Sequence, residues 1–382
     1  MIIGPAAEGS FYFARPYLEE RFWKKIKESH HLSITAPRRV GKSSFMLHLL
    51  KNDRDGYFCI YIITESINEP NEFFKKIYKT LLKRLNTGGK FKQFIEDLYK
   101  RLDIRKISMT EIEFGKNEID YYEEILLLCR EVKDSDIRIV LMIDEFSQTL
   151  ENIITDQSRE VAKNFLHQCR ELRQNLDVKS KISFVYTGSV GLENLVHSID
   201  EARSINDLGH LNIPPFSKIE ARSLITQIVD GDAIIFTERE LDYFLNKMNW
   251  LLPYFIQLMM SELDGICKER SSQEITQEII EEAFRNALEN RSYFEHWSTR
   301  LRSIFKGHDF SCAKEILKIA AVGKGIDAFQ LQDVITKFKI EEAAPMMNIL
   351  QHDGYLVKDD HSNKYRFNSP LLEAWWVKNI VI

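Results

Sequence analysis

The residues with the clearest capacity for chemistry lie near the N-terminus, in residues 36–43, which read APRRVGKS. They match the phosphate-binding pattern G-x-x-x-x-G-K-[ST], with Ala36 in place of the first glycine. In such a loop, backbone N–H groups and a helix N-terminus point at phosphate oxygens. Gly41 would let the backbone approach closely, and Ala36 fits if its φ is negative. We predict that Lys42 reaches the β- and γ-phosphates of ATP and that the Ser43 hydroxyl binds Mg²⁺.

Two carboxylates follow a later candidate strand. Residues 137–143 (IRIVLMI) run directly into Asp144 and Glu145. This arrangement predicts that Asp144 holds Mg²⁺ and that Glu145 orients or deprotonates the attacking water. Side chains alternate along a strand, so the two carboxylates need not compete for one role. A chance strand-to-helix turn and a solvated strand end are the plain alternatives, but two motifs in this order favour nucleotide binding.

A third polar segment, residues 186–189 (YTGS), ends another candidate strand. A side chain at this place can reach a γ-phosphate or the attacking water from beside the phosphate-binding loop. Ser189 is the first choice and Thr187 the second, whereas a turn that caps the next helix is an equally good interpretation. The predicted catalytic residues are therefore Glu145, Lys42 and Ser189.

These motifs need a sheet that brings strand ends together. Short apolar runs that suit buried strands occur at residues 32–36, 57–64, 137–143, 182–187 and, more weakly, 211–213, and helical patterns at 43–52, 69–85, 121–132 and 158–176 alternate with them. This alternation predicts a parallel, three-layer α/β domain. Partial alternation over residues 104–114 predicts a hairpin or short strand within an insertion, residues 86–118, to which we assign no chemistry.

The second half of the chain is predicted to be mainly helical. Residues 218–288 show helical patterns, and a final block reads helix (312–321), helix (328–338), helix (341–351), strand (355–358) and strand (364–367), which is a winged-helix order, before a last helix (370–380). We therefore expect a phosphate-loop core over 1–215, a helical lid over 216–300 and a winged-helix domain over 301–382.

Five segments together resemble a known family. They are residues 11–16 (FYFARP), residues 36–43, residues 215–217 (PFS) followed by Glu220 and Ala221, residues 253–257 (PYFIQ), and residues 365–372 (YRFNSPLL) followed by Trp375 and Trp376. The chain resembles the AAA+/STAND-like P-loop ATPases related to replication initiators, especially the archaeal-type ATPase group. The matching pieces span nearly the whole chain.

The resemblance implies an ATPase core, a helical lid and a winged-helix domain. It also implies that Arg15 lies near the nucleotide and that Pro253 shapes the lid. Leu251 stands where the family usually has glycine, two residues before the lid proline. The residues predicted to contact nucleotide are Arg15, Pro37, Arg38, Arg39, Val40, Gly41, Lys42, Ser43, Ser44 and Pro253, with Ser43 and Asp144 as metal ligands.

Several other side chains have a plain interpretation beside a functional one. Arg203 is a candidate arginine finger acting on a neighbouring subunit, with Arg170 and Arg173 as competitors, but a surface salt bridge is the favoured interpretation for each. The pair His30-His31 is expected on a loop surface. Trp375 and Trp376 are expected to pin the terminal helix to the core.

Composition narrows the classes of function. The net charge of −5 and pI of about 6.1 give no global support for nucleic-acid binding. Five scattered cysteines without a C-x-x-C pair indicate reduced thiols in a cytoplasmic protein. No secretory signal and no apolar window of membrane-spanning length are visible.

The motifs and the resemblance together predict a slow ATPase that acts as a molecular switch. ATP would bridge the core and the lid, and hydrolysis to ADP would re-orient the winged helix toward a protein partner or a second copy. A role in signalling or defence follows from the resemblance only. A DNA-loading or DNA-remodelling ATPase is the main alternative, and a small-molecule phosphotransferase is a third.

The third helix of the winged-helix block bears on the DNA alternative. Residues 341–351 carry two glutamates and no Lys or Arg, and the following turn, residues 359–363, is acidic. A groove-reading helix needs basic neighbours for the phosphates. Met346 and Met347 offer an apolar contact instead, although burial is expected for at least one. We therefore predict that this domain contacts protein rather than DNA.

Overall fold

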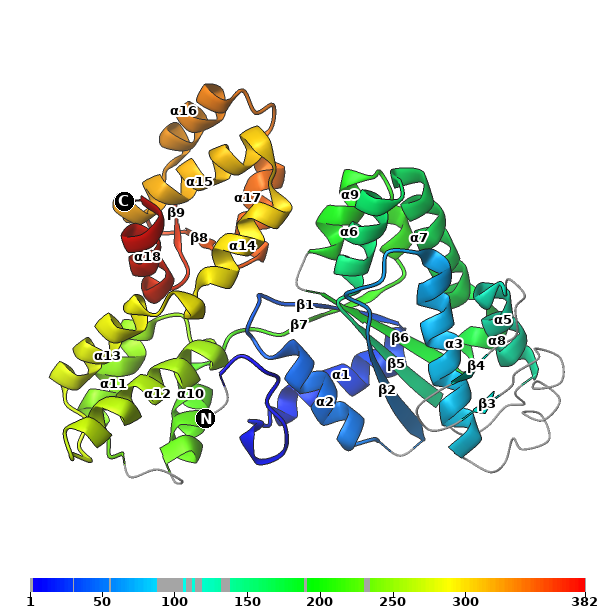
Figure 1. Ribbon diagram of the computed structural model, residues 1–382, viewed down its shortest axis with the longest axis horizontal. Coiled ribbons are helices and arrows are strands. Elements are labelled where there is room, and N and C mark those ends of the chain that lie inside the picture. Colours follow the sequence, from blue (N-terminus) through cyan, green and yellow to red (C-terminus); the bar gives the residue numbers. More distant parts are fainter. Residues whose placement is uncertain are drawn as a thin grey trace. The chain divides into compact units, whose positions relative to one another are not determined.

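The computed structural model describes residues 3–29, 31–54, 56–87, 106–107, 112–113, 119–131, 138–188, 191–229 and 234–381. They form two compact units (Figure 1). The sheet unit comprises Arg15–Thr35 and Phe45–Asn212, and the helical unit comprises Met1–Ala14, Ala36–Ser44 and Ile213–Ile382. The phosphate-binding loop thus belongs by its contacts to the helical unit, although it continues directly from strand β1 of the sheet unit.

The sheet unit alternates strands and helices along the chain. Its elements are α1 (Pro16–Ser29), β1 (Leu32–Thr35), α2 (Lys42–Lys51, whose first three residues belong to the helical unit), β2 (Tyr57–Ile63), α3 (Pro70–Thr87), β3 (Lys106–Ile107), β4 (Ile112–Glu113), α5 (Tyr121–Glu131), β5 (Arg138–Asp144), α6 (Phe146–Asp156), α7 (Arg159–Gln174), α8 (Leu176–Lys179), β6 (Ile182–Thr187), α9 (Leu192–Ser198), η2 (Ala202–Ile205) and β7 (Gly209–Asn212).

Five strands form one parallel sheet in the order β2-β5-β6-β1-β7. The register pairs Ile63 with Asp144 and Ile143 with Tyr186, so the carboxyl ends of β2, β5 and β6 lie at the same edge. Helices cover both faces (Figure 1). The predicted parallel α/β core is confirmed, and β3 and β4 form the short antiparallel hairpin expected within residues 104–114.

The alternation of side chains along β5 explains the layers. Leu141 and Ile143 enter a large apolar core shared with α3, α5, α6, α7 and α9. Val140 and Met142 are equally buried but point to the opposite face, because successive side chains of a strand alternate. Burial on both faces accounts for the continuous apolar run in the sequence.

Helix α6 was not expected from the sequence. It begins at Phe146, one residue after Glu145, and no glycine or proline marks the change from strand to helix. Glu145 instead makes the turn itself, with a left-handed backbone (φ 57°, ψ 32°). Residues other than glycine adopt this conformation uncommonly, which is why turn-residue patterns missed the boundary.

His31 is buried, contrary to the expectation of a surface loop. Its side chain accepts a hydrogen bond from the Phe184 backbone N–H at Nδ1 (3.2 Å), and Nε2 lies 2.9 Å from the carbonyl oxygen of Arg173. A backbone N–H only donates, so Nδ1 is the acceptor and Nε2 carries the proton. The imidazole thereby links β6 to the end of α7.

Arg173 is also buried, with 2% of its side chain exposed, and is not the surface residue expected. Its guanidinium donates to both carboxylate oxygens of Asp207 (2.7 and 2.8 Å) and to the carbonyl of Ser204 (2.6 Å). Burial opposes ionisation of Asp207, but the hydrogen bond and charge of Arg173 prevail and hold the pKa of Asp207 below its ordinary value. This bidentate pair ties α7 to the segment between η2 and β7.

The helical unit contains a bundle and a C-terminal domain. Its elements are η1 (Gly9–Phe11), α10 (Lys218–Val229), α11 (Glu238–Met248), α12 (Pro253–Glu269), α13 (Gln277–Glu289), η3 (Arg291–Tyr293), α14 (Glu295–Ile304), α15 (Gly307–Val322), α16 (Ala328–Phe338), α17 (Ala343–His352), β8 (Leu356–Asp359), β9 (Lys364–Phe367), α18 (Pro370–Trp376) and the π-helical η4 (Val377–Val381). Among the described residues, no helix is long and apolar enough to cross a membrane.

Helix α12 is the centre of the bundle. Ten of its residues are buried, and it packs against α10 and α13. Pro253 occupies its first turn, where a missing backbone N–H costs nothing. A chain of ring contacts continues from the bundle into the C-terminal domain through Trp250, Trp297, Tyr355 and Trp376. The bundle and the C-terminal domain therefore share one aromatic core.

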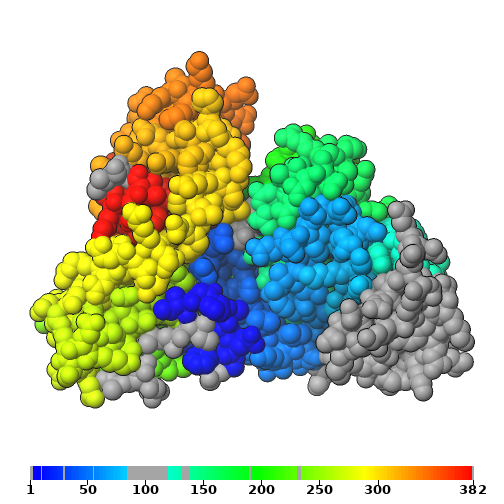
Figure 2. All heavy atoms as spheres, in the orientation of Figure 1, coloured from blue at the N-terminus to red at the C-terminus, as the bar shows by residue number. Residues whose placement is uncertain are grey.

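The C-terminal domain has the predicted order of three helices and a two-stranded hairpin. The hairpin pairs β8 with β9, and Ile326, between α15 and α16, forms a further antiparallel bridge with Tyr365. Trp375 and Trp376 are buried and contact each other, so the terminal helix is pinned as expected. Helix α16 exposes most of its side chains and lies on the surface (orange in Figure 2).

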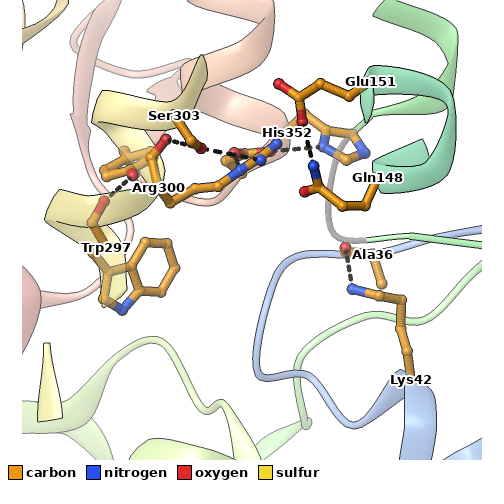
Figure 3. Close-up of polar contacts among 10 residues, drawn as sticks. Ala36, Lys42, Gln148, Glu151, Trp297, Arg300, Ser303 and His352 are labelled. Atoms are coloured by element: carbon orange, nitrogen blue, oxygen red, sulfur yellow. Dashed lines mark hydrogen bonds and ion pairs between the residues drawn. The ribbon is translucent and has the colours of Figure 1, made fainter. Parts of the chain in front are cut away.

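A buried ion pair fixes the end of α17. Arg300 in α14 donates from Nε to Asp353 (3.1 Å), and both side chains are almost fully buried; Figure 3 shows Arg300 beside Ser303. Met346 and Met347 are both buried, so neither supplies the exposed apolar contact considered from the sequence. The exposed positions of α17 include Ala344, Pro345 and Asn348.

The Arg173 pair gives a test of the sheet unit. Arg173→Leu leaves Asp207 without its bidentate partner and should lower the free energy of unfolding by about 3–5 kcal/mol. The matched control is Arg222→Leu, because Arg222 also contacts two carboxylates, Glu238 and Asp242, but at the surface. That change should cost no more than about 1 kcal/mol. Denaturant unfolding followed by circular dichroism compares them, and equal losses would contradict the assignment of Arg173 as a structural anchor.

Gly188 gives a second test, at the end of β6. A Cβ at this position would lie 1.7 Å from Ser147 Oγ and 2.9 Å from Ser147 Cβ, and Ser147 is buried. Gly188→Ala should therefore destabilise the fold by about 1–3 kcal/mol through overpacking. Gly265→Ala is the control, because no atom lies within 4 Å of its added methyl and the change should stabilise α12 by about 0.4–1 kcal/mol. An unaltered melting temperature for Gly188→Ala would show that α6 shifts to make room for the methyl group without loss of stability.

Candidate functional site

The phosphate-binding loop alternates its backbone handedness. Arg39 (φ 65°) and Gly41 (φ 97°) have positive φ on either side of Val40. Such alternation turns successive N–H groups toward one concavity, the arrangement that binds anions. Ala36 is not among the described residues with positive φ, so its methyl group causes no strain and explains why alanine replaces glycine there.

Lys42 is folded back across this loop. Its ammonium group donates to the carbonyl oxygens of Ala36 (3.0 Å) and Pro37 (3.1 Å), and 8% of the residue is exposed (Figure 3). Ser44 accepts a hydrogen bond from the backbone N–H of Ala7 (2.9 Å), which attaches the N-terminal segment to the loop. Ser43 lies between them in the first turn of α2, as the motif requires.

The side chain of Arg39 points into the protein. Nη1 donates to the carbonyl of Gly4 (2.8 Å), and the guanidinium lies 4.7 Å from the ring centroid of Tyr254, the residue after Pro253 in α12. Burial lowers the pKa of Arg39 below its ordinary value despite the attraction of the Tyr254 ring. The guanidinium thus joins the N-terminal segment, the loop and α12, while the backbone of Arg39 stays part of the concavity.

A neutral histidine lies close to the loop arginines. Burial, together with the charges of Arg39 and then Arg38, lowers the pKa of His296 to about 3. His296 sits edge-on against Tyr254, with ring centroids 5.7 Å apart. The imidazole is therefore uncharged at neutral pH and acts as packing for the arginine-tyrosine contact.

The C-terminal domain also contacts the loop. A Cβ on Gly354, in the turn after α17, would lie 2.5 Å from Trp250 and 3.4 Å from Pro37. Gly354 has φ 83°, so both its conformation and its close neighbours require glycine. Gly354 thus lies close to both Trp250 and Pro37, all within the helical unit.

Asp144 is a buried carboxylate of the sheet unit with several hydrogen-bond donors around it. It is 2% exposed, and Oδ1 accepts from the Thr187 hydroxyl (2.5 Å) and from the Glu145 backbone N–H (3.0 Å). Tyr61 donates its hydroxyl to Oδ2 (2.7 Å), and the Thr64 N–H donates to the carbonyl of Asp144 (3.0 Å). A buried polar group is costly unless it is hydrogen-bonded, and these donors satisfy both oxygens of the carboxylate.

The other two predicted catalytic residues are Glu145 and Ser189. Glu145 is half-buried and caps the strand with its left-handed backbone, directly before α6. Ser189, the first choice for the third polar group, lies outside the described residues. Thr187, the second choice, is the residue whose hydroxyl reaches Asp144.

The arginines outside the loop occupy distinct surroundings. Arg15 is buried at the start of α1 and donates to Tyr17 Oη (2.6 Å). Arg203 is 73% exposed and lies 3.8 Å from Glu201, whereas Arg173 is committed to Asp207. The structure thus leaves Arg203 as the better exposed of these two candidate fingers.

Two anchoring residues of Asp144 were missed from the sequence. Tyr61 lies in the run YFCIYII, where its aromatic ring looked like one more apolar strand residue. A hydroxyl in a strand beside the candidate carboxylate strand was the signal available for it. Thr64 ends the same run, and its hydroxyl, like its N–H, bonds to the Asp144 carbonyl (3.1 Å).

The predicted metal ligands do not belong to a cluster of ligating side chains. Among the residues that the structure describes, no group of three or more His, Cys, Asp or Glu side chains could hold a metal ion. Asp144, in the sheet unit, and Ser43, in the helical unit, therefore stay predicted metal ligands.

Comparison with known proteins supports the architecture. No family model matches the chain, and no curated protein matches its sequence. Among solved structures, the Walker-type ATPase PABY2304 of Pyrococcus abyssi aligns with a TM-score of 0.63 at 16% identity over 97% of this chain and 98% of the other. The ORC2 protein of Aeropyrum pernix, solved as ADPNP-ADP complexes, aligns with a TM-score of 0.57 at 13% identity over 100% and 96%. Over at least 97% of its length, the chain therefore shares its fold with these two proteins.

Proposed function

We propose that this chain is an ATP-binding and ATP-hydrolysing molecular switch. The observation that carries the proposal is the loop backbone at Arg39 and Gly41, whose alternating handedness suits an anion. Lys42 already binds two carbonyl oxygens, so its ammonium can exchange them for phosphate oxygens without new desolvation. We assign the β- and γ-phosphates to the backbone of residues 37–44 and to Lys42.

We assign Mg²⁺ to Ser43 and Asp144. The hydroxyl and the carboxylate are hard oxygen ligands of the kind that Mg²⁺ prefers. When bound, the metal neutralises charge on the phosphate oxygens. The hydrogen bonds on Asp144 support this assignment, because they hold the carboxylate in one orientation.

Glu145 is the proposed group that orients or deprotonates the attacking water. Its backbone position is fixed by the bond to Asp144 and by the start of α6, while its side chain remains half-exposed. Ser189 remains the proposed third polar group, and Thr187 is the alternative, which would act through its hydrogen bond to Asp144. Arg15 and Pro253 remain proposed neighbours of the nucleotide on the strength of the family resemblance.

The switch is proposed to work through the helical unit. Pro37 packs with Gly354 of the C-terminal domain, and Arg39 binds Tyr254 of α12, so a change in loop conformation reaches both directly. ATP shifts such an equilibrium only by its differential affinity for the two conformations. We propose that the bundle, 216–300, acts as a lid and that the C-terminal domain, 301–382, is a winged helix.

We propose that the winged helix contacts protein, either a partner or a second copy, in a cytoplasmic signalling or defence setting. The exposed positions of α17 include Ala344, Pro345 and Asn348 and carry no positive charge. A DNA-loading ATPase is the second candidate. It is favoured by Lys358, Lys364 and Arg366 in the hairpin, although Arg366 is paired with Asp359 (2.7 Å).

Nucleotide binding and hydrolysis can be separated by two substitutions. Mg-ATP at about a hundred times its Kd should stabilise the wild-type protein by about 2.7 kcal/mol, measured as a rise in melting temperature. Lys42→Ala should abolish most of that rise, and Glu145→Gln should keep it but turn over ATP far more slowly. Lys24→Ala, at an exposed lysine paired with Glu28, is the control and should match the wild type. A wild-type melting temperature that does not change when Mg-ATP is added would refute the proposal.

The choice between protein and DNA can be tested with the full chain. Titration with duplex DNA at two salt concentrations should give a Kd weaker than about 10⁻⁴ M, because α17 offers no cations for phosphate neutralisation. Micromolar affinity that weakens steeply with added salt, the sign of released counterions, would instead favour the DNA-loading function. Lys358→Ala would then identify the hairpin as the binding element if it reduced the salt dependence.

A further inference from the structure

Tyr61 reaches the candidate metal ligand from the neighbouring strand. Its hydroxyl lies 2.7 Å from Asp144 Oδ2 and donates to it. Tyr61 is in β2 and Asp144 ends β5, and the two strands pair in parallel with Ile63 opposite Asp144. Tyr61 is therefore two residues before the position facing Asp144, and the length of a tyrosine side chain spans that offset.

The hydrogen bond constrains a torsion of the Asp144 side chain. Thr187 and the Glu145 N–H both bind Oδ1, and Thr64 binds the backbone carbonyl. Rotation of a carboxylate about its last side-chain bond is intrinsically broad, because that torsion joins sp³ and sp² atoms. A donor on Oδ2, opposite the donors on Oδ1, sets the plane of the carboxylate.

The surroundings make this contact more than incidental packing. Asp144 is buried, so a hydrogen bond to it forms where water competes little and where charge-assisted bonds are strongest. Tyr61 itself is half-buried in an otherwise apolar strand. A phenylalanine would fill the same place, so the hydroxyl is the atom whose role needs explanation.

We propose that Tyr61 is a positioning residue that orients Asp144 toward Mg²⁺ and thereby sets the metal dependence of nucleotide binding. This inference rests on the proposed function. Partners that hydrogen-bond to a metal ligand hold its geometry and tune its basicity, and their loss typically costs about 10–100-fold in metal affinity or activity. The effect is confined to the Mg²⁺-dependent part of binding, because Tyr61 does not belong to the loop that binds phosphate.

The test compares Tyr61→Phe with the wild type in titrations of ATP, once with Mg²⁺ and once with EDTA. Tyr61→Phe should bind ATP unchanged in EDTA, while the gain in affinity on adding Mg²⁺ falls by about tenfold. Mn²⁺ replaces Mg²⁺ in a second series, where paramagnetic resonance counts bound metal directly and should show the same loss.

Tyr122→Phe is the matched control. Tyr122 is a half-buried tyrosine of the same unit whose hydroxyl also donates to a carboxylate, Glu171 (2.8 Å), on another element. Tyr122→Phe should leave the gain in ATP affinity on adding Mg²⁺ at the wild-type level. Melting temperatures of both variants verify that each remains folded.

The outcomes separate this inference from the proposed function. A wild-type protein that binds no ATP in either buffer refutes both. A wild type that shows the Mg²⁺ gain, with Tyr61→Phe equal to it, overturns the role of Tyr61 alone. An equal loss of ATP affinity with Mg²⁺ and with EDTA would also overturn it, because such a loss indicates general damage to the site. A larger gain in ATP affinity on adding Mg²⁺ in Tyr61→Phe would overturn it as well, because the tyrosine hydroxyl would then compete with the metal for Asp144.

Discussion

A single buried carboxylate organises the edge of the sheet. Asp144 is buried and accepts hydrogen bonds from residues of β2 and β6, the strands on either side of β5, and from Thr64 directly after β2. Parallel pairing makes this convergence possible, because the strands end at one edge and in register. The same bonds fix Thr64 after β2, and Thr149 in α6 donates to the Thr64 carbonyl (2.7 Å), so the helix behind Glu145 is anchored as well.

The phosphate-binding loop is constrained in a different way. Its backbone depends on contacts with the N-terminal segment, the bundle and the C-terminal domain, made through Arg39, Ser44 and Pro37. A loop held only by its own sheet would pass little of its state to other elements. A loop held by three further segments makes its conformation a property of the whole helical unit, which is what a switch requires.

The features that could be predicted from the sequence are those that depend on residues close together along the chain. Apolar runs predicted the strands, and the motif spacing identified the loop and the carboxylates, because each depends on neighbours within a few residues. Prediction from the sequence failed for His31 and Arg173, whose partners lie far along the chain; the Phe184 N–H that binds His31 is 153 residues away. It could not show that the Thr187 hydroxyl bonds to Asp144, because the strand-end position alone does not reveal this contact. The site assignments themselves remain predictions until nucleotide binding is measured.

The aromatic core has a consequence for spectroscopy. Of the five tryptophans, Trp23 alone belongs to the sheet unit, and the other four lie in the helical unit. Trp250 packs at Gly354 beside Pro37, and Trp297 lies 6.1 Å from it between ring centroids, close enough to exchange excitation energy. Intrinsic ultraviolet emission of this protein is therefore dominated by indoles of the helical unit, one of them next to the phosphate-binding loop. Replacing Trp23 by phenylalanine would turn that emission into an optical signal of the helical unit alone, with no dye attached.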